Sequence, residues 1–220
     1  MPAERIIRVQ RTARYYTLGT WSEATTCLWI VCHGYAQLAG DFIKQFEVLA
    51  DDHTAIAAPE ALSRFYPKAG DPRVGATWMT REDREHEIKD YVDYLNQLYH
   101  QLVNELPSLH QVNILGFSQG CATVSRWVAS GKSPFNDLWL CAGDVPPDLD
   151  YKAFNTALTG NRLHVLIGTE DHFITPTKVE EVKQRLEKEH VAYQMHTFAG
   201  AHVINLELLK ELAGIHSAKS

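Results

Sequence analysis

Ser118 stands at the centre of residues 116–120 (GFSQG), a segment of the form Gly-x-Ser-x-Gly. An apolar run typical of a buried strand precedes it at residues 112–117, and a helical pattern follows it at residues 119–129. A serine at such a strand-to-helix turn is held in a strained backbone conformation, and the flanking glycines let neighbouring segments approach closely. This pattern predicts that Ser118 is the nucleophile of an acyl-transfer reaction.

A serine hydroxyl needs a base to accept its proton, and in this arrangement the histidine follows the serine and the acid in the chain. Of the eleven histidines, only His172, His196 and His202 lie after Ser118 where they could reach the carboxyl ends of the strands. His202 is favoured because it follows the last expected strand, in a Gly-Ala-His segment whose small residues let a loop present the ring. His196 lies inside that strand, but it and His172 remain alternatives.

The acid that orients the histidine is predicted to be Asp171, which follows the apolar run at residues 163–167. Its position is one strand–helix unit before His202, at the same edge of the expected sheet. Glu170 is adjacent but is expected to point the other way. Asp144, which follows the preceding expected strand, is a competitor, because some proteins with such a triad place the acid one strand earlier.

Two backbone N–H groups are predicted to stabilise the negative charge that develops on the substrate carbonyl oxygen. One belongs to Gln119, the residue after the nucleophile, and the other to Tyr35, in the loop after an early strand expected at Cys27–Cys32. Gly34 is expected to permit the turn of that loop. His33 precedes the nucleophile in the chain and is interpreted as a structural residue that holds the loop.

Short apolar runs alternate with amphipathic stretches, which predicts an α/β fold with a mostly parallel central sheet and helices on both faces. We expect one domain over residues 1–220. Strands are expected at residues 27–32, 54–58, 112–117, 138–142, 163–167 and 192–198, with an N-terminal antiparallel pair at residues 6–9 and 14–18. Helices are expected at residues 41–50, 119–129 and 203–212. Two further helices are expected from apolar stripes, one from Ile88 to Leu102 with Thr80 as its N-cap and one from Val179 to Leu186 with Thr175 as its N-cap.

Residues 59–78 form a long irregular segment that is rich in aromatic residues, glycine and proline. Long loops in compact domains are often functional, so one hypothesis is that this segment walls the substrate site. The alternative is a surface excursion whose aromatic side chains pack inward. Under the first hypothesis, Phe65, Tyr66 and Trp78 supply apolar pocket walls together with Phe173.

Composition and charge favour some classes of protein over others. The chain has 220 residues, a hydrophobic fraction of 45% and a formal net charge of −6, which indicate a globular protein and argue against nucleic-acid binding. No apolar run is long enough to span a bilayer, and the N-terminus lacks the apolar core of a signal peptide, so a cytoplasmic location is expected. The four cysteines match neither a disulfide framework nor a zinc site, and no metal is expected.

The sequence resembles the small carboxylesterase/phospholipase family that includes acyl-protein thioesterases and lysophospholipases. The resemblance rests on residues 31–35 (VCHGY), 116–120 (GFSQG), 168–171 (GTED) and 200–202 (GAH), in matching order and spacing. It implies an α/β-hydrolase with a minimal or absent cap domain, a serine nucleophile, no metal or organic cofactor, and often a homodimer. A small-molecule ester or thioester is the implied substrate.

Two departures from that family lie where its substrate would enter. The family's loop after His-Gly is commonly rich in glycine and aspartate, whereas residues 35–40 read YAQLAG, and Asp144 stands where the family usually has an uncharged residue. We therefore expect short- to medium-chain acyl esters, or thioesters, in place of long-chain lipids. Two other hypotheses are a catalytically silent binding module with a hydrolase fold, and a C–C hydrolase or peptidase that uses the same triad.

Overall fold

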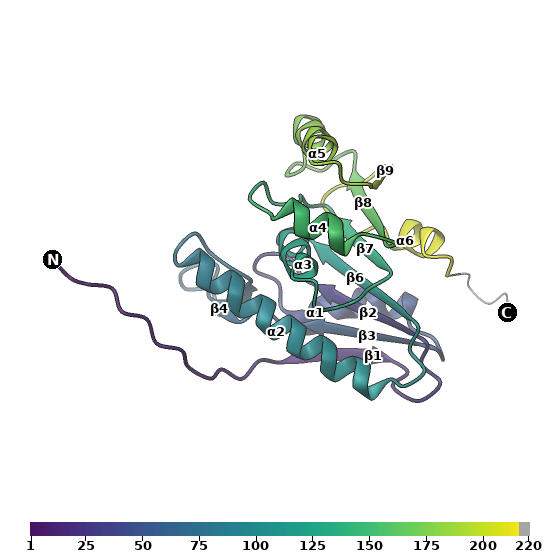
Figure 1. The fold of residues 1–220 in the computed structure, drawn as a ribbon, viewed down its shortest axis with the longest axis horizontal. Coiled ribbons are helices and arrows are strands. Elements are labelled where there is room, and N and C mark those ends of the chain that lie inside the picture. Colours follow the sequence, from purple (N-terminus) through teal and green to yellow (C-terminus); the bar gives the residue numbers. More distant parts are fainter. Residues whose placement is uncertain (216–220) are drawn as a thin grey trace.

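A seven-stranded sheet in the order β1-β3-β2-β6-β7-β8-β9 forms the centre of the molecule (Figure 1). The computed structural model describes residues 1–215, so the end of the expected domain, residues 216–220, lies outside the described part. The strands are β1 (Tyr15–Gly19), β2 (Cys27–Cys32), β3 (Thr54–Pro59), β6 (Gln111–Phe117), β7 (Asp137–Cys141), β8 (Arg162–Gly168) and β9 (Gln194–Phe198). Neighbours from β3 to β9 are parallel, and β1 is antiparallel to β3. The predicted α/β fold with a mostly parallel sheet is confirmed.

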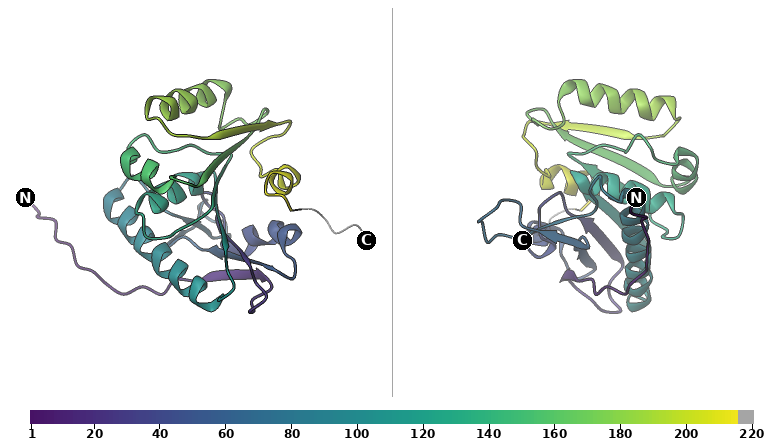
Figure 2. Two further views of the ribbon diagram at one scale, coloured as in Figure 1. Left: turned by 45° about the vertical axis from the view of Figure 1, so that its right-hand side comes forward. Right: turned by 90° about the vertical axis from the view of Figure 1, so that its left-hand side faces the viewer.

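Helices cover both faces of this sheet, as predicted. The helical elements are α1 (Ala39–Phe42), the 3-10 helix η1 (Ile43–Leu49), α2 (Arg84–Glu105), α3 (Gln119–Ala129), α4 (Tyr151–Ala157), α5 (Pro176–Lys188) and α6 (Leu206–Leu212). Figure 2 shows α2 to α5 on one face of the sheet, with η1 and α6 on the other.

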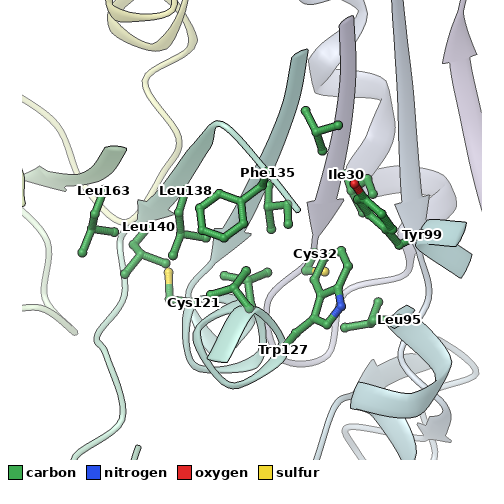
Figure 3. Packing of buried hydrophobic residues seen from close by; sticks show 14 of the residues in the cluster. Ile30, Cys32, Leu95, Tyr99, Cys121, Trp127, Phe135, Leu138, Leu140 and Leu163 are labelled. Carbon is green, nitrogen blue, oxygen red and sulfur yellow. The ribbon is translucent and has the colours of Figure 1, made fainter. Parts of the chain in front are cut away.

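Alternate side chains of each buried strand enter opposite faces of the sheet, which divides the core in two. In β2, Leu28 and Ile30 belong to the larger cluster under α2 and α3, whereas Trp29 and Val31 belong to the cluster under η1 and α6. Figure 3 shows Trp127 on the side of α3 that faces the strands of the larger cluster. Because both faces are covered, these strands are almost continuously apolar.

The predicted N-terminal strand pair is wrong. Residues 6–9 form no strand, and Ile7 is 84% exposed on an arm that runs away from the body of the molecule (Figure 1). The other half of the expected pair does form as β1, but it pairs with β3, where Tyr15 lies opposite Pro59. The reason is burial: the edge of β3 offers a fully buried partner, whereas residues 6–9 carry apolar side chains with nothing to cover them.

Helix starts were predicted with mixed success. Thr175 caps α5 as expected, since its hydroxyl accepts a hydrogen bond from the Lys178 N–H. Thr80 does not cap α2, which begins at Arg84 after Asp83 in a left-handed conformation with φ 49°. The short helix α4 was not predicted from sequence. The expected helix at residues 41–50 is α1 followed by the 3-10 helix η1.

The segment at residues 59–78 folds as a small antiparallel hairpin of β4 (Ser63–Phe65) and β5 (Gly75–Thr77). At its base, the side chain of Glu60 is fully buried and joins three parts of the chain. Its carboxylate accepts hydrogen bonds from Arg14 Nε at 2.7 Å, Arg64 Nε at 2.6 Å and the Ala39 N–H at 3.3 Å. Glu60 therefore ties β1, the hairpin and the start of α1 together.

Glu60 stays ionised in the folded protein. Burial acts to raise the pKa of its carboxyl, but the hydrogen bonds and charges of Arg14 and Arg64 outweigh burial and hold that pKa below its ordinary value. A carboxyl whose pKa is lower in the folded state stabilises the fold above its unfolded pKa and loses that contribution as the pH falls through the folded pKa.

We therefore expect Glu60→Gln to lower the free energy of unfolding by about 1–3 kcal/mol at neutral pH, because two arginines lose their charged partner. The difference from the wild type should shrink as the pH falls below about 4.3, the pKa of an unfolded glutamate. Thermal melts over a pH series measure this. Glu105→Gln, at an exposed position, is the control and should leave the melting curve unchanged. A difference that persists undiminished in acid would mean that the charge of Glu60 is not what stabilises the fold.

Candidate active site

Ser118 occupies the tight turn between β6 and α3, with the backbone angles φ 53° and ψ −116°. Its N–H donates to the Cys141 carbonyl oxygen at 3.0 Å, which anchors the turn to β7. The turn leaves no room for side chains two residues away on either side. A Cβ at Gly116 would lie 2.4 Å from the Gly120 carbonyl oxygen, and a Cβ at Gly120 would lie 2.3 Å from the Cys32 carbonyl oxygen. The requirement for glycine at both positions therefore comes from close backbone approach.

Three side chains that are far apart in the sequence form one hydrogen-bonded row at the carboxyl ends of β6, β8 and β9. Ser118 Oγ lies 3.0 Å from His202 Nε2, and His202 Nδ1 lies 2.7 Å from Asp171 Oδ2. Because a carboxylate can only accept, the ring hydrogen is assigned to Nδ1, which leaves Nε2 free to accept from the Ser118 hydroxyl. The structure thus brings together the nucleophile, base and acid that the sequence predicts.

Asp171 is held as an ionised, fully buried carboxylate. Its Oδ1 accepts hydrogen bonds from the N–H groups of Phe173 at 2.8 Å and Ile174 at 2.9 Å, while Oδ2 faces His202. Burial acts to raise the pKa of Asp171, but these hydrogen bonds outweigh burial and hold the pKa below its ordinary value. The backbone turn after β8 therefore fixes both the charge and the direction of this side chain.

The His202 ring is positioned by aromatic contacts on two sides. Its centroid lies 5.0 Å from that of Phe117 and 4.8 Å from that of Phe173. Phe117 belongs to β6 and Phe173 to the loop after β8, so the ring is held between the elements that carry the serine and the acid.

The competing acids and bases are not joined to Ser118 or to His202 by a hydrogen bond in the described residues. Asp144 is engaged by Arg185, whose Nη1 lies 2.8 Å from its Oδ1. Glu170 is exposed, as is His172. His196 projects from β9 toward His164, with the two ring nitrogens 3.4 Å apart. Among the four alternatives to Asp171 and His202, none contacts Ser118 through a hydrogen bond in the described residues.

The loop after β2 lies directly against Ser118. A Cβ on Gly34 would lie 3.2 Å from the Ser118 Cβ, and the positive φ in this loop belongs to Ala36, at 61°. Gly34 is therefore needed for space and not for a positive φ. The Gly34 N–H donates to Gln37 Oε1 at 2.8 Å, whereas the Tyr35 N–H has no acceptor among residues 1–215.

His33 fixes this loop from beneath. Its Nδ1 lies 2.7 Å from the Gly34 carbonyl oxygen, its Nε2 accepts from the Ala61 N–H at 3.1 Å, and its own carbonyl oxygen accepts from Trp78 Nε1 at 2.9 Å. Burial lowers the pKa of His33, which keeps the ring neutral and suits one donating and one accepting nitrogen. Both ring nitrogens are used, one by the loop itself and the other by Ala61 after β3, in agreement with a structural role.

The β4–β5 hairpin supports the loop and the serine turn from behind. The Ala36 N–H donates to the Ala76 carbonyl oxygen at 2.9 Å, so the loop runs alongside β5. The Gln119 side chain also reaches the hairpin, where its Nε2 donates to Thr77 Oγ1 at 2.9 Å and to the Met79 carbonyl oxygen at 3.0 Å. The hairpin thereby sets the relative position of the two N–H groups proposed from the sequence, those of Tyr35 and Gln119.

A cavity of about 820 Å³ opens above Ser118. Its walls come from the loops after β2, β6, β7, β8 and β9, and include Tyr35, Gln37, Phe117, Ala122, Ala142, Gly143, Asp144, Phe173, Ile174, His202, Val203 and Ile204. Within the described residues, no group of three or more His, Cys, Asp or Glu side chains is arranged to hold a metal ion.

The predicted pocket residues separate into two groups. Phe173 lines the cavity, whereas Trp78 is 2% exposed and lies beneath His33. Phe65 packs on the Tyr35 ring at 5.1 Å, and neither it nor Tyr66 lines the cavity. The expectation that Phe65, Tyr66 and Trp78 form cavity walls is therefore wrong, because the segment that carries them backs the loop and does not line the cavity. The sequence suggested no role in the cavity for Ile204 or Ala122, since single apolar residues near a helix start carry no distinguishing signal.

Comparison with known proteins identifies a family match. Residues 33–206 match the family model described as serine hydrolase (FSH1), a stretch that contains every residue of the hydrogen-bonded row. No curated protein matches the sequence.

Solved structures of similar fold include three esterases or thioesterases. A carboxylesterase from Mesorhizobium loti has a TM-score of 0.69 at 17% identity, over 92% of this chain and 95% of that one. A phospholipase/carboxylesterase from Dyadobacter fermentans has a TM-score of 0.65 at 17% identity, over 94% and 97%. Acyl-protein thioesterase 2 from Zea mays has a TM-score of 0.64 at 13% identity, over 92% and 97%. These likenesses show the α/β-hydrolase fold, and with the family match they bear out the expected resemblance to carboxylesterase/phospholipase-like proteins.

The strained backbone at Ser118 predicts an unusual order of stability between two variants. Ser118→Ala keeps the unfavourable positive φ, which costs roughly 1–3 kcal/mol. Ser118→Gly removes this cost. It lowers the free energy of unfolding by only about 0.5–1 kcal/mol, because glycine has more conformational freedom in the unfolded chain. We expect the glycine variant to melt about 2–4 °C higher than the alanine variant in calorimetry.

Ser130 is the matched control, because it follows the same helix with an ordinary φ of −66°. There the order should reverse, with Ser130→Gly less stable than Ser130→Ala. The same order at both positions would show that the Ser118 turn stores no strain.

Proposed function

The chain belongs to the serine hydrolase (FSH1) family, and on this premise we propose that it is a carboxylesterase for short- to medium-chain acyl esters, with thioesters as further substrates. The observation that carries the proposal is the hydrogen-bonded row from Ser118 through His202 to Asp171, which opens into the cavity. No helix among residues 1–215 is long and apolar enough to cross a membrane.

In the proposed reaction, Ser118 Oγ attacks the ester carbonyl carbon while its proton passes to His202 Nε2. Asp171 holds the ring in the reactive tautomer and stabilises the imidazolium that forms. The imidazolium then donates its proton to the departing alcohol or thiol, which leaves an acyl group on Ser118. Water, deprotonated by the same nitrogen, attacks the acyl group and releases the carboxylic acid.

The negative charge on the former carbonyl oxygen would be stabilised by the N–H groups of Tyr35 and Gln119. Two features support this assignment. Gln119 is the first residue of α3, where N–H groups lack partners within the helix, and the Tyr35 N–H lacks an acceptor among the described residues. Donors that are fixed before the reaction stabilise such a charge without reorganisation, and removal of one typically costs about 10²–10³-fold in kcat.

The complete row of serine, histidine and ionised aspartate argues against a catalytically silent binding module, because nothing but catalysis requires the three side chains in this geometry. A C–C hydrolase or peptidase would use the same three groups. Ester and thioester cleavage is favoured by the names of the similar structures, which include carboxylesterases and an acyl-protein thioesterase.

Covalent labelling tests the nucleophile directly. We expect a fluorophosphonate probe to label the wild-type protein once and to leave Ser118→Ala unlabelled, because only a serine activated by its base attacks the phosphorus. Intact-protein mass spectrometry measures the adduct. Ser125→Ala, at a buried serine of α3 whose hydroxyl donates to the Cys121 carbonyl oxygen, is the control and should be labelled normally.

Substrate panels then separate the enzyme classes. Turnover of p-nitrophenyl esters and acyl-CoA thioesters that disappears in Ser118→Ala would support the proposal. Labelling without any ester or thioester turnover would point to the C–C hydrolase or peptidase, and the absence of Ser118-dependent labelling would support the silent module.

Asp171→Asn should lower kcat for p-nitrophenyl acetate by roughly 10⁴-fold, because an amide no longer fixes the His202 tautomer or stabilises the imidazolium. Steady-state kinetics measure the loss, and circular dichroism checks that the fold is retained. Asp148→Asn, in the loop before α4 and outside the cavity, is the control and should keep wild-type kinetics. A loss of this size in Asp144→Asn, with turnover retained in Asp171→Asn, would assign the acid to Asp144 instead.

A further inference from the structure

Asp144 is a charged residue in the wall of the cavity that the proposed reaction does not use. It follows β7 and lies next to Gly143, whose Cα is so close to the serine turn that an added Cβ would be 2.6 Å from the Ser118 carbonyl oxygen. Asp144 is therefore a residue of the cavity wall whose chain neighbour, Gly143, packs directly against the serine turn.

Two cations from α5 hold this carboxylate in place. Arg185 Nη1 lies 2.8 Å from Asp144 Oδ1 and 3.0 Å from Oδ2, and Lys178 Nζ lies 3.1 Å from Oδ2. Arg185 also donates to the Val145 carbonyl oxygen. The side chains of Asp144 and Arg185 are each only 18% exposed, so this ion pair cannot turn away to let another group take its place.

The geometry of the proposed reaction indicates which part of the substrate meets Asp144. In the tetrahedral intermediate the carbonyl carbon is bonded to Ser118 Oγ, its oxygen faces Tyr35 and Gln119, and its leaving group faces His202. The remaining substituent is the acyl chain, which must point to the part of the wall that none of these groups occupies. That part includes Ala122 from α3, Gly143 and Asp144 from the loop after β7, and Ile174 from the loop after β8.

We propose that Asp144, held by Arg185 and Lys178, is a specificity-determining residue that restricts this enzyme to esters of short acyl chains. This inference rests on the proposed esterase function. Ala122 and Ile174 offer apolar contact to the first carbons of the chain, and the ion pair then meets the carbons beyond them. An apolar chain pressed against an ion pair removes water from the charges and supplies no hydrogen bond in return. The cavity volume would admit a longer chain, so the limit comes from charge.

The test compares acyl chain lengths in a variant that replaces the ion pair with apolar side chains. In Asp144→Leu/Arg185→Met no charge is left unpaired, since Lys178 keeps Glu181 as a partner at 3.2 Å. Steady-state kinetics with p-nitrophenyl acetate, butyrate and octanoate give kcat/KM for each ester. The wild type should prefer acetate or butyrate. Each methylene that contacts an apolar wall adds about fourfold, so two new contacts should raise the octanoate-to-acetate ratio roughly 16-fold in the double variant.

Asp148→Leu is the matched control. Asp148 lies in the same loop before α4 and also pairs with two arginines, Arg84 and Arg126, but it does not line the cavity. Its octanoate-to-acetate ratio should equal that of the wild type. Thermal melts check folding, and Asp144→Asn/Arg185→Gln, which removes both charges of the pair with little change in size, provides a second variant whose ratio should also rise.

Each outcome has a distinct meaning. A wild type that prefers octanoate, or variants of Asp144 whose ratio stays within twofold of the wild-type ratio, would overturn the role of Asp144. A change confined to a series of acetate esters with longer alcohols would also overturn it, because the leaving group and not the acyl chain would then face Asp144. A failure of the esterase proposal itself would be distinguishable, because no Ser118-dependent turnover of p-nitrophenyl acetate would then be measured at all.

Discussion

The tight turn between β6 and α3 exists only because the backbone of β2 touches the first turn of α3. Gly120 lies so close to the Cys32 carbonyl oxygen that any side chain there would collide with it, and Gly116 meets Gly120 in the same way. This contact forces Ser118 into a positive φ and brings its hydroxyl out of the sheet. It also places the loop after β2 beside Ser118, so one close approach accounts for both the half-buried serine in the cavity and the wall that faces it.

The loop after β2 has no regular secondary structure of its own, and three interactions with neighbouring segments hold its shape. His33 uses both ring nitrogens within the fold, Trp78 donates to the His33 carbonyl oxygen, and Ala36 pairs with β5. Glu60 in turn fastens the base of the hairpin to β1 and α1. The hairpin is therefore a support that lies behind the site, and its aromatic residues act through packing.

Asp144 and Asp171 show how environment separates two aspartates that follow neighbouring strands. Asp171 receives two backbone N–H groups and the His202 ring, which leave it ionised and aimed at His202. Asp144 meets Arg185 and Lys178 from α5, which neutralise it in the cavity wall. Both residues stand at the same edge of the sheet. The partners that each loop offers decide that one orients a histidine and the other shapes the cavity.

The sequence by itself predicted the strands of the main sheet and the candidate reactive groups, but not α4 or the β4–β5 hairpin. Apolar runs located every strand from β2 to β9 in the main sheet, and motif order singled out Ser118, Asp171 and His202, because both signals are local. It could not determine what touches across the chain. The partner of β1, the position of Trp78 beneath His33, the true start of α2 and the ion pair at Asp144 all depend on contacts between segments distant in sequence. Only the tertiary structure decides such contacts, since burial and charge pairing are properties of neighbours in space.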